Sequence, residues 1–161
     1  MIRRAEDEDA AAIADTWNEA ISEGKSLYWR SPVSQESVLR LISSESAFRV
    51  EEEDKLVRGF YLLHANAPDR DSHIANAMYV VRRACRGLGI GRLLAEGSLS
   101  LAAELGFRAM QFNSVVESNT ASVSLWRSLG FVEIGRVPGA FKFDSGEAVD
   151  VLIFYRGLGR Q

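Results

Sequence analysis

Three glycines at alternate positions, Gly87, Gly89 and Gly91, lie within an arginine-rich stretch over 82–92. Because glycine has no Cβ, main-chain N–H groups at these positions can approach a ligand closely. An amphipathic segment begins here, and the free N–H groups at a helix N-terminus favour an anion such as a pyrophosphate. The spacing therefore indicates a phosphate-binding turn, although a solvated basic turn would contain the same residue types.

Two other phosphate-binding motifs do not fit this stretch. The dinucleotide fingerprint requires G-x-G-x-x-G, whereas these glycines alternate without that gap. The P-loop requires Gly-Lys-Ser/Thr, and no such triplet follows the glycines. A Rossmann-type dinucleotide enzyme is therefore disfavoured.

Other side chains of the chain have types that could do chemistry. Asn76 and Asn113 are polar residues on otherwise apolar strands, where they would contact a substrate or satisfy a neighbouring main-chain group. His73 is suited by type to be a general base, but it stands at the start of its strand, far from the turn. Glu117 could pass a proton through water or lie in a solvated loop. Cys85 has no identifiable base to activate it as a nucleophile.

The elements that must position these residues alternate between short apolar strands and amphipathic helices. Helices are predicted from the acidic run 6–9 to Gly24, and over 34–44, 89–105 and 119–129. Strands are predicted over 1–4, 47–53, 57–65, 73–81, 108–116, 131–137 and 148–155, with a hairpin turn at 54–55 and a loop before the last strand. This order predicts a mixed α/β sheet with helices on both faces.

Composition excludes several classes of protein. The 161 residues suffice for one core rather than two, so a single domain over 1–161 is expected. The net charge of −3 provides no basic face for nucleic acid. Every apolar stretch is shorter than the roughly 18 residues of a membrane span, and no signal peptide is recognisable. The lone cysteine fits a reducing compartment, so we expect a cytoplasmic protein.

Two segments together resemble the GNAT superfamily of acetyl-CoA-dependent N-acetyltransferases. Arg86-Gly87-Leu88-Gly89-Ile90-Gly91 matches that superfamily's R/Q-x-x-G-x-G/A motif. Downstream, the stretch 119–126 and the segment Leu129-Gly130-Phe131 are similar to its N-x-x-[AS]-x-x-[LF]-[YW]…GF landmark. The order and separation agree, and the resemblance covers essentially the whole chain. It implies the GNAT fold, a mostly antiparallel sheet of about seven strands.

The resemblance also implies where acetyl-CoA binds. The main-chain N–H groups of 86–91, with Arg92, would hold the pyrophosphate. The fourth and fifth strands, over 74–81 and 108–116, would splay apart, and the pantetheine arm would pair with the main chain at Val80 and Val81. The Val81 N–H would polarise the thioester carbonyl, and Asn119 would hydrogen-bond the cofactor. No metal is implied.

A narrower resemblance links the chain to a GNAT subgroup that acetylates small amino acids and proline-like analogues. It rests on the segments 72–77, 112–116 and 135–141. It implies that Asn76 and Asn113 orient the amine and carboxylate of the substrate. Tyr28 and Trp29 lie in the loop that covers the acceptor site in this fold, as a wall for the substrate or as a packed loop. Homodimers are common in such families.

One position departs from the family pattern. Many members have a tyrosine where this chain has Trp126, and that tyrosine protonates the departing thiolate. An indole has no proton to give at neutral pH. A thiol has a pKa of about 8.5, so a thiolate leaving group scarcely needs an acid. We therefore expect direct transfer in a ternary complex, from acetyl-CoA to the amine of a small molecule. A protein N-terminal or lysine acetyltransferase and a non-catalytic CoA-binding module are the alternatives.

Overall fold

The computed structural model describes residues 1–44 and 47–159. Its strands are β1 (Ile2–Arg4), β2 (Phe48–Glu53), β3 (Leu56–Ala65), β4 (Ile74–Val81), β5 (Ala109–Val116), β6 (Val132–Lys142) and β7 (Ala148–Gly157). Its helices are α1 (Ala10–Glu23), α2 (Gln35–Ser44), α3 (Ile90–Glu104) and α4 (Thr120–Ser128), with 3₁₀ turns η1 (Asp7–Asp9), η2 (Asp69–Asp71) and η3 (Arg83–Cys85).

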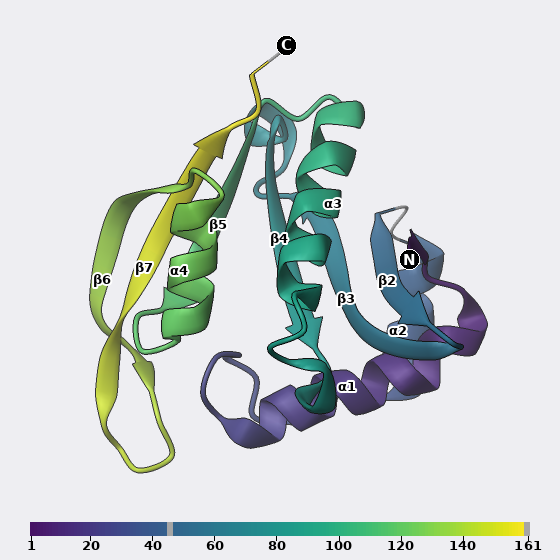
Figure 1. Ribbon diagram of the computed structural model, residues 1–161. Coiled ribbons are helices and arrows are strands. Elements are labelled where there is room, and N and C mark those ends of the chain that lie inside the picture. The colour runs from purple at the N-terminus through teal and green to yellow at the C-terminus, as the bar shows by residue number, and fades with distance from the viewer. Residues whose placement is uncertain (45–46, 160–161) are drawn as a thin grey trace.

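The strands form one sheet in the order β1-β2-β3-β4-β5-β7-β6. Among the described residues, only the β4–β5 pair is parallel, and every other neighbouring pair is antiparallel. In Figure 1, α3 and α4 lie over one face of the sheet, while α1 crosses below it. The expected mixed, mostly antiparallel α/β sheet with helices on both faces is therefore confirmed.

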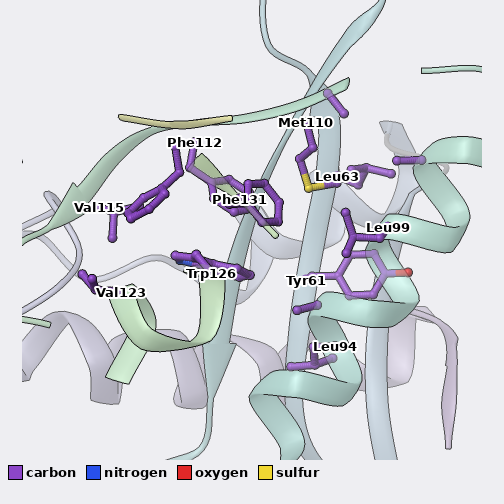
Figure 2. Packing of buried hydrophobic residues seen from close by; sticks show 14 of the residues in the cluster. Tyr61, Leu63, Leu94, Leu99, Met110, Phe112, Val115, Val123, Trp126 and Phe131 are labelled. Carbon is purple, nitrogen blue, oxygen red and sulfur yellow. The ribbon is translucent and has the colours of Figure 1, made fainter. Parts of the chain in front are cut away.

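Each face of the sheet carries its own apolar core. Under α3 and α4, the buried side chains include Tyr61, Leu94, Met110, Phe112 and Trp126, several of which are labelled in Figure 2. On the other face, α1 and α2 cover a second core whose members include Ile13, Trp17, Val38, Phe48 and Phe60. The strands alternate their side chains between these two cores, which fixes the register of the sheet.

The structure corrects the sequence prediction in two places. The acidic run was expected to open a helix, but Asp7–Asp9 form a 3₁₀ turn, and α1 begins at Ala10. A loop was expected from 138, but β6 continues to Lys142 through irregular pairing between Val137 and Phe141. Pro138 is compatible with this strand because β6 lies at the sheet edge, where a missing N–H breaks no ladder.

Candidate active site

The strands β4 and β5 separate soon after they meet. Their pairing consists of Ile74 with Ala109 and Ala75 with Met110. Beyond these residues the two strands diverge, as Figure 1 shows, and β5 also carries an irregularity between Phe112 and Val115. The expected splay is therefore present, and the last six residues of β4 have no partner strand on that side.

The pairing of β4 with β3 shows which main-chain groups face this gap. Arg82 N donates to Arg58 O at 2.9 Å, which makes that opposed pair a hydrogen-bonded one. Because hydrogen-bonded and non-hydrogen-bonded pairs alternate in an antiparallel ladder, the next hydrogen-bonded pair is Val80 with Phe60. The N–H and C=O groups of Val81 and Tyr79 consequently point toward β5, where no strand receives them.

The two predicted β4 positions therefore differ. Val80 lines the cleft, but its N–H and C=O belong to the ladder with β3. The N–H of Val81 points into the gap, and its predicted role toward the thioester stays a prediction. The residue that sequence reasoning missed is Tyr79, whose N–H is equally free and which also lines the cleft. Strand alternation would have found it once the register was known.

The glycine-rich turn follows β4 and leads into α3. Gly87 and Gly89 have φ angles of +79° and +80°, and a Cβ built on either would meet no atom within 4 Å. Gly89 is the N-cap of α3, so the first N–H groups of that helix are directed at the space beside the turn. Ile90 is buried beneath the turn, and Leu88 is 65% exposed at its tip.

A cleft of about 1000 Å³ joins this turn to the splay. The predicted cofactor residues among its lining residues are Val80, Val81, Arg86, Gly87, Gly89, Ile90, Gly91, Arg92 and Asn119. The remaining predicted one, Leu88, does not line it. The cleft continues to the loop after α1, which contributes Leu27, and to the β6–β7 hairpin, which contributes Phe143. It therefore extends from the glycine-rich turn to this loop and hairpin.

Carboxylates of α1 hold the arginines of the turn. Arg86 Nη1 and Arg83 Nε each donate to Glu23 at 2.8 Å, and the Arg83 N–H donates to Glu19 at 2.7 Å. Arg86 Nε also donates to Val81 O at 3.3 Å. Burial of Glu23 disfavours its ionised form, but the hydrogen bonds from Arg86 and Arg83 outweigh that cost and hold its pKa below the usual value. No sequence pattern indicated these pairs, which join segments about sixty residues apart.

Asn119 has a structural role that the motif alone did not show. Its Oδ1 accepts a hydrogen bond from the Ser122 N–H at 3.3 Å and so caps α4. Its amide nitrogen is not used by the cap, and the residue lines the cleft. One side chain can thus start the helix and still donate to a ligand.

Aromatic rings close the α3–α4 side of the splay. The Trp126 ring lies 5.0 Å from Tyr79 and 4.4 Å from Phe112, centroid to centroid (Figure 2 shows Trp126 beside Phe112). The Tyr79 hydroxyl lies 2.7 Å from Ser98 Oγ, which itself donates to Ala95 O, so Tyr79 is the donor. Burial raises the Tyr79 pKa well above its usual value. Neither ring is therefore suited to protonate a thiolate near neutral pH.

The predicted substrate residues lie outside this cleft. Asn76 and Asn113 do not line it, and the amides of both donate to Asn66 Oδ1. Tyr28 and Trp29 stack on one another at 3.9 Å and line a second cavity of about 460 Å³. This cavity shares Gly24, Leu27 and Asp144 with the cleft, so the two spaces adjoin at these residues.

The other reactive candidates are placed as follows. The ring of His73 contacts the carbonyl of Arg70 at the start of β4, away from Val81. Glu117 pairs with Arg136 at 2.6 Å. Cys85 is buried in η3 and lines the cleft. Within 1–44 and 47–159, no cluster of His, Cys, Asp and Glu could hold a metal ion, and no helix is long and apolar enough to cross a membrane.

Comparison with known proteins agrees with this geometry. The model of the Acetyltransferase (GNAT) family matches residues 12–131. A GCN5-related N-acetyltransferase from Kribbella flavida is 36% identical, with a TM-score of 0.90 and coverage of 98% of this chain and 96% of that chain. YncA from Salmonella typhimurium, solved with acetyl-CoA, has a TM-score of 0.92 at 23% identity and coverage of 100% and 95%.

Among curated proteins, a Bacillus subtilis relative named Putative phosphinothricin acetyltransferase YwnH is 27% identical over 163 residues, 98% of each chain. Other curated relatives are longer, and the matched region spans 46% of one and 14% of another. The chain belongs to the GNAT acetyltransferase family. Family membership confirms the predicted recognition and fold, and it defines the class as N-acetyltransferases.

Proposed function

We propose that this chain transfers the acetyl group of acetyl-CoA to the amine of a small molecule. The observation that carries the proposal is that two groups of main-chain donors line one cleft. One group lies at the glycine turn and the N-terminus of α3, and the other consists of the gap-facing N–H groups of Val81 and Tyr79. Main-chain N–H groups rarely remain unpaired, so a ligand with an anionic end and amide-containing arm completes this site.

The residues of the cleft define the steps of the reaction. The turn 86–91 and Arg92 hold the pyrophosphate, and the pantetheine arm lies in the splay beside β4. A neutral amine attacks the thioester carbonyl, and the Val81 or Tyr79 N–H donates to the oxyanion that develops. The electron pair then returns to the carbonyl, CoA leaves as a thiolate, and the positively charged nitrogen gives its extra proton to the thiolate or to water. Holding both reactants in one cleft supplies much of the rate.

The acceptor in this proposal is small, in the class of amino acids and their analogues. The space at the acceptor end is limited by the loop carrying Tyr28 and Trp29 and by the β6–β7 hairpin. An ion pair between Arg30 and Asp144 joins these two segments across the opening. The relative YwnH, whose name refers to an amino acid analogue, supports the same class of acceptor.

We further propose that residues 1–161 form a single domain. Two copies of it form a homodimer in the cytoplasm. Val132, Ile134 and Val137 on β6 are 57%, 55% and 44% exposed, and β6 is an edge strand. Apolar side chains gathered on an edge favour association with a second copy. The thiol of Cys85 is free and buried, as expected in a reducing compartment. Light scattering of the wild type and of Ile134→Lys would test the dimer, which the substitution should dissociate.

The central experiment is release of free CoA from acetyl-CoA in the presence of small amines and amino acids, including proline analogues. The proposal is supported if at least one small amine is acetylated and if peptide acceptors give no acetylated peptide. At 100-fold over its Kd, a ligand of the native state adds about 2.7 kcal/mol to the free energy of unfolding. Acetyl-CoA should therefore raise the melting temperature, and NAD should not. Binding of acetyl-CoA without turnover of any amine would instead indicate a non-catalytic module.

A further inference from the structure

Asn66, directly after β3, links the two strands that form the splay. Its Oδ1 accepts a hydrogen bond from Asn76 Nδ2 at 3.0 Å and another from Asn113 Nδ2 at 2.7 Å. Its own N–H donates to Ile74 O at 2.8 Å, which fixes its main chain to β4. Asn76 belongs to β4 and Asn113 to β5. One amide oxygen thus connects three separate segments of the chain.

This three-amide bracket, formed by Asn66, Asn76 and Asn113, lies where the strands begin to part. Asn76 follows Ala75, which is in the last pair between β4 and β5. Asn113 lies just beyond Phe112, where the regular pairing of β5 with β7 is interrupted. Within the described β4–β5 pairing, no main-chain ladder continues past this point, so the bracket supplies the next polar link between the strands.

The bracket is on the face of the sheet opposite α3 and α4. Ala75 and Ala77 pack into the core under α3, so Asn76 between them points to the other face. Phe112 likewise packs against Trp126 in that core, so the neighbouring Asn113 faces the same side as Asn76. The bracket therefore spans the splay on the face opposite α3 and α4, and it does not enter the cleft.

The distance along β4 argues against contact of these amides with a small acceptor. Asn76 is five residues from Val81 and three from Tyr79, which corresponds to about 16 Å and about 10 Å along a strand. An α-amino acid carries its amine and carboxylate on one carbon. It cannot reach the thioester at either free N–H while its carboxylate rests on Asn76.

We propose that Asn66 is a positioning residue that sets the angle between β4 and β5 and hence the width of the acetyl-CoA cleft. The main-chain pairing of β5 with β4 ends at Ile74–Ala109 and Ala75–Met110, and on the face opposite α3 the bracket adds side-chain hydrogen bonds beyond it. Without the bracket, the gap-facing N–H groups would be presented to the pantetheine arm at a variable distance. This inference rests on the proposed function, because the cleft it adjusts is the one assigned to acetyl-CoA.

The test is the Kd of CoA, measured by calorimetry without any acceptor. Asn66→Leu removes the shared oxygen and should weaken CoA binding about tenfold, the loss that corresponds to roughly one net hydrogen bond. Asn66→Asp keeps an oxygen that accepts from both amides and should stay within about threefold of the wild type. Asn113→Leu, at an exposed position, cuts the link to β5, removes the acceptor of the Gln111 amide as well, and should behave like Asn66→Leu.

His64→Ala is the matched control, since His64 is opposite Asn76 but bonds only its neighbour's carbonyl at Ala65 O. Its CoA affinity should equal that of the wild type. Unchanged affinity in folded Asn66→Leu or Asn113→Leu overturns the inference, as does equal weakening in Asn66→Asp and Asn66→Leu. Circular dichroism identifies any variant that fails to fold. If Asn66→Leu does not fold, the CoA affinity of Asn113→Leu decides whether the inference holds. A wild type that does not bind CoA would overturn the proposed function itself, which separates the two failures.

Discussion

Arg86 Nη1 donates to Glu23 Oε2 at 2.8 Å, so the last turn of α1 holds the first residue of the glycine-rich turn. Glu23 is 15% exposed, and its other oxygen accepts from Arg83. The positive charge beside the α3 N-terminus is therefore partly neutralised and fixed in place before any anion binds. The same contact joins α1 to the turn that follows β4.

The first prediction concerns the ion pairs of Glu23 and the effect of acidic pH on them. Replacing Glu23 with Gln should lower the free energy of unfolding at pH 7 by about 1 kcal/mol, a modest value because both arginines are about half exposed. The Glu23 pKa lies below its ordinary value of 4.5, so its stabilising contribution is present above that pH. It is lost as the pH falls through the folded-state value.

Melting temperatures of the wild type and Glu23→Gln should therefore differ at pH 7 and converge as the pH falls below about 4.5. Glu36→Gln is the control, since Glu36 pairs with Arg40 on an exposed face of α2 and is 80% exposed. That substitution should change the melting temperature little at any pH. A constant difference for Glu23→Gln across the acid range would contradict the assignment.

The second prediction separates the effect of backbone strain from the effect of blocking the glycine-rich turn. Gly89→Val places a side chain in the open space beside the turn and should weaken CoA binding at least tenfold. A residue with a Cβ at positive φ also costs about 1–2 kcal/mol. Gly106→Val carries the same strain, because Gly106 has φ +86° with nothing within 4 Å, but it lies beyond the other end of α3.

Both glycine variants should melt at lower temperature, and only Gly89→Val should lose affinity for CoA by calorimetry. Equal affinities for the two variants would remove the turn from the binding site.

The third prediction divides the two roles of Asn119. Asn119→Asp keeps an oxygen that caps α4, so the melting temperature should be unchanged. It replaces the amide donor with a negative charge beside the phosphates, and CoA affinity should fall about tenfold. Asn119→Ala removes the cap as well and should cost about 1 kcal/mol of the free energy of unfolding. Retained CoA affinity in Asn119→Asp would limit this residue to capping.

The fourth prediction is that the Tyr79 hydroxyl is structural. Tyr79→Phe removes the donor to Ser98 and should lower the free energy of unfolding by about 1 kcal/mol. The rate of acetyl transfer should change less than about threefold, because burial raises the Tyr79 pKa and makes it a poor acid for a thiolate. A fall in kcat by about a hundredfold or more would identify Tyr79 as the acid after all.

The fifth prediction is the pH dependence of turnover. The acceptor amine must lose its proton before it attacks, so kcat/KM should rise with pH up to the pKa of the free amine. Glu23 adds no inflection above pH 5, since its pKa lies below 4.5. His73→Ala should leave the profile unchanged, because His73 lies at the far end of β4. Initial rates of two amines that differ in pKa would show whether the profile follows the substrate.

Local signals were enough to predict most of the fold and the glycine-rich turn that lines one end of the cleft. Glycine spacing, capping residues and apolar periodicity act over a few residues, and they located α3, α4 and the turn 86–91. The extension of β6 through Pro138 was missed because the tolerance of a proline depends on whether its strand is at an edge. That property belongs to the assembled sheet.

The sequence by itself determined that main-chain donors follow β4 at a helix N-terminus, since three glycines and their neighbours specify this within ten residues. Only the tertiary structure decided that Glu23 holds Arg86 and that Asn66 draws together Asn76 and Asn113. It also decided which β4 amides face the gap, because the register with β3 sets their direction. These contacts join residues that are distant along the chain, and their distances depend on how the elements pack.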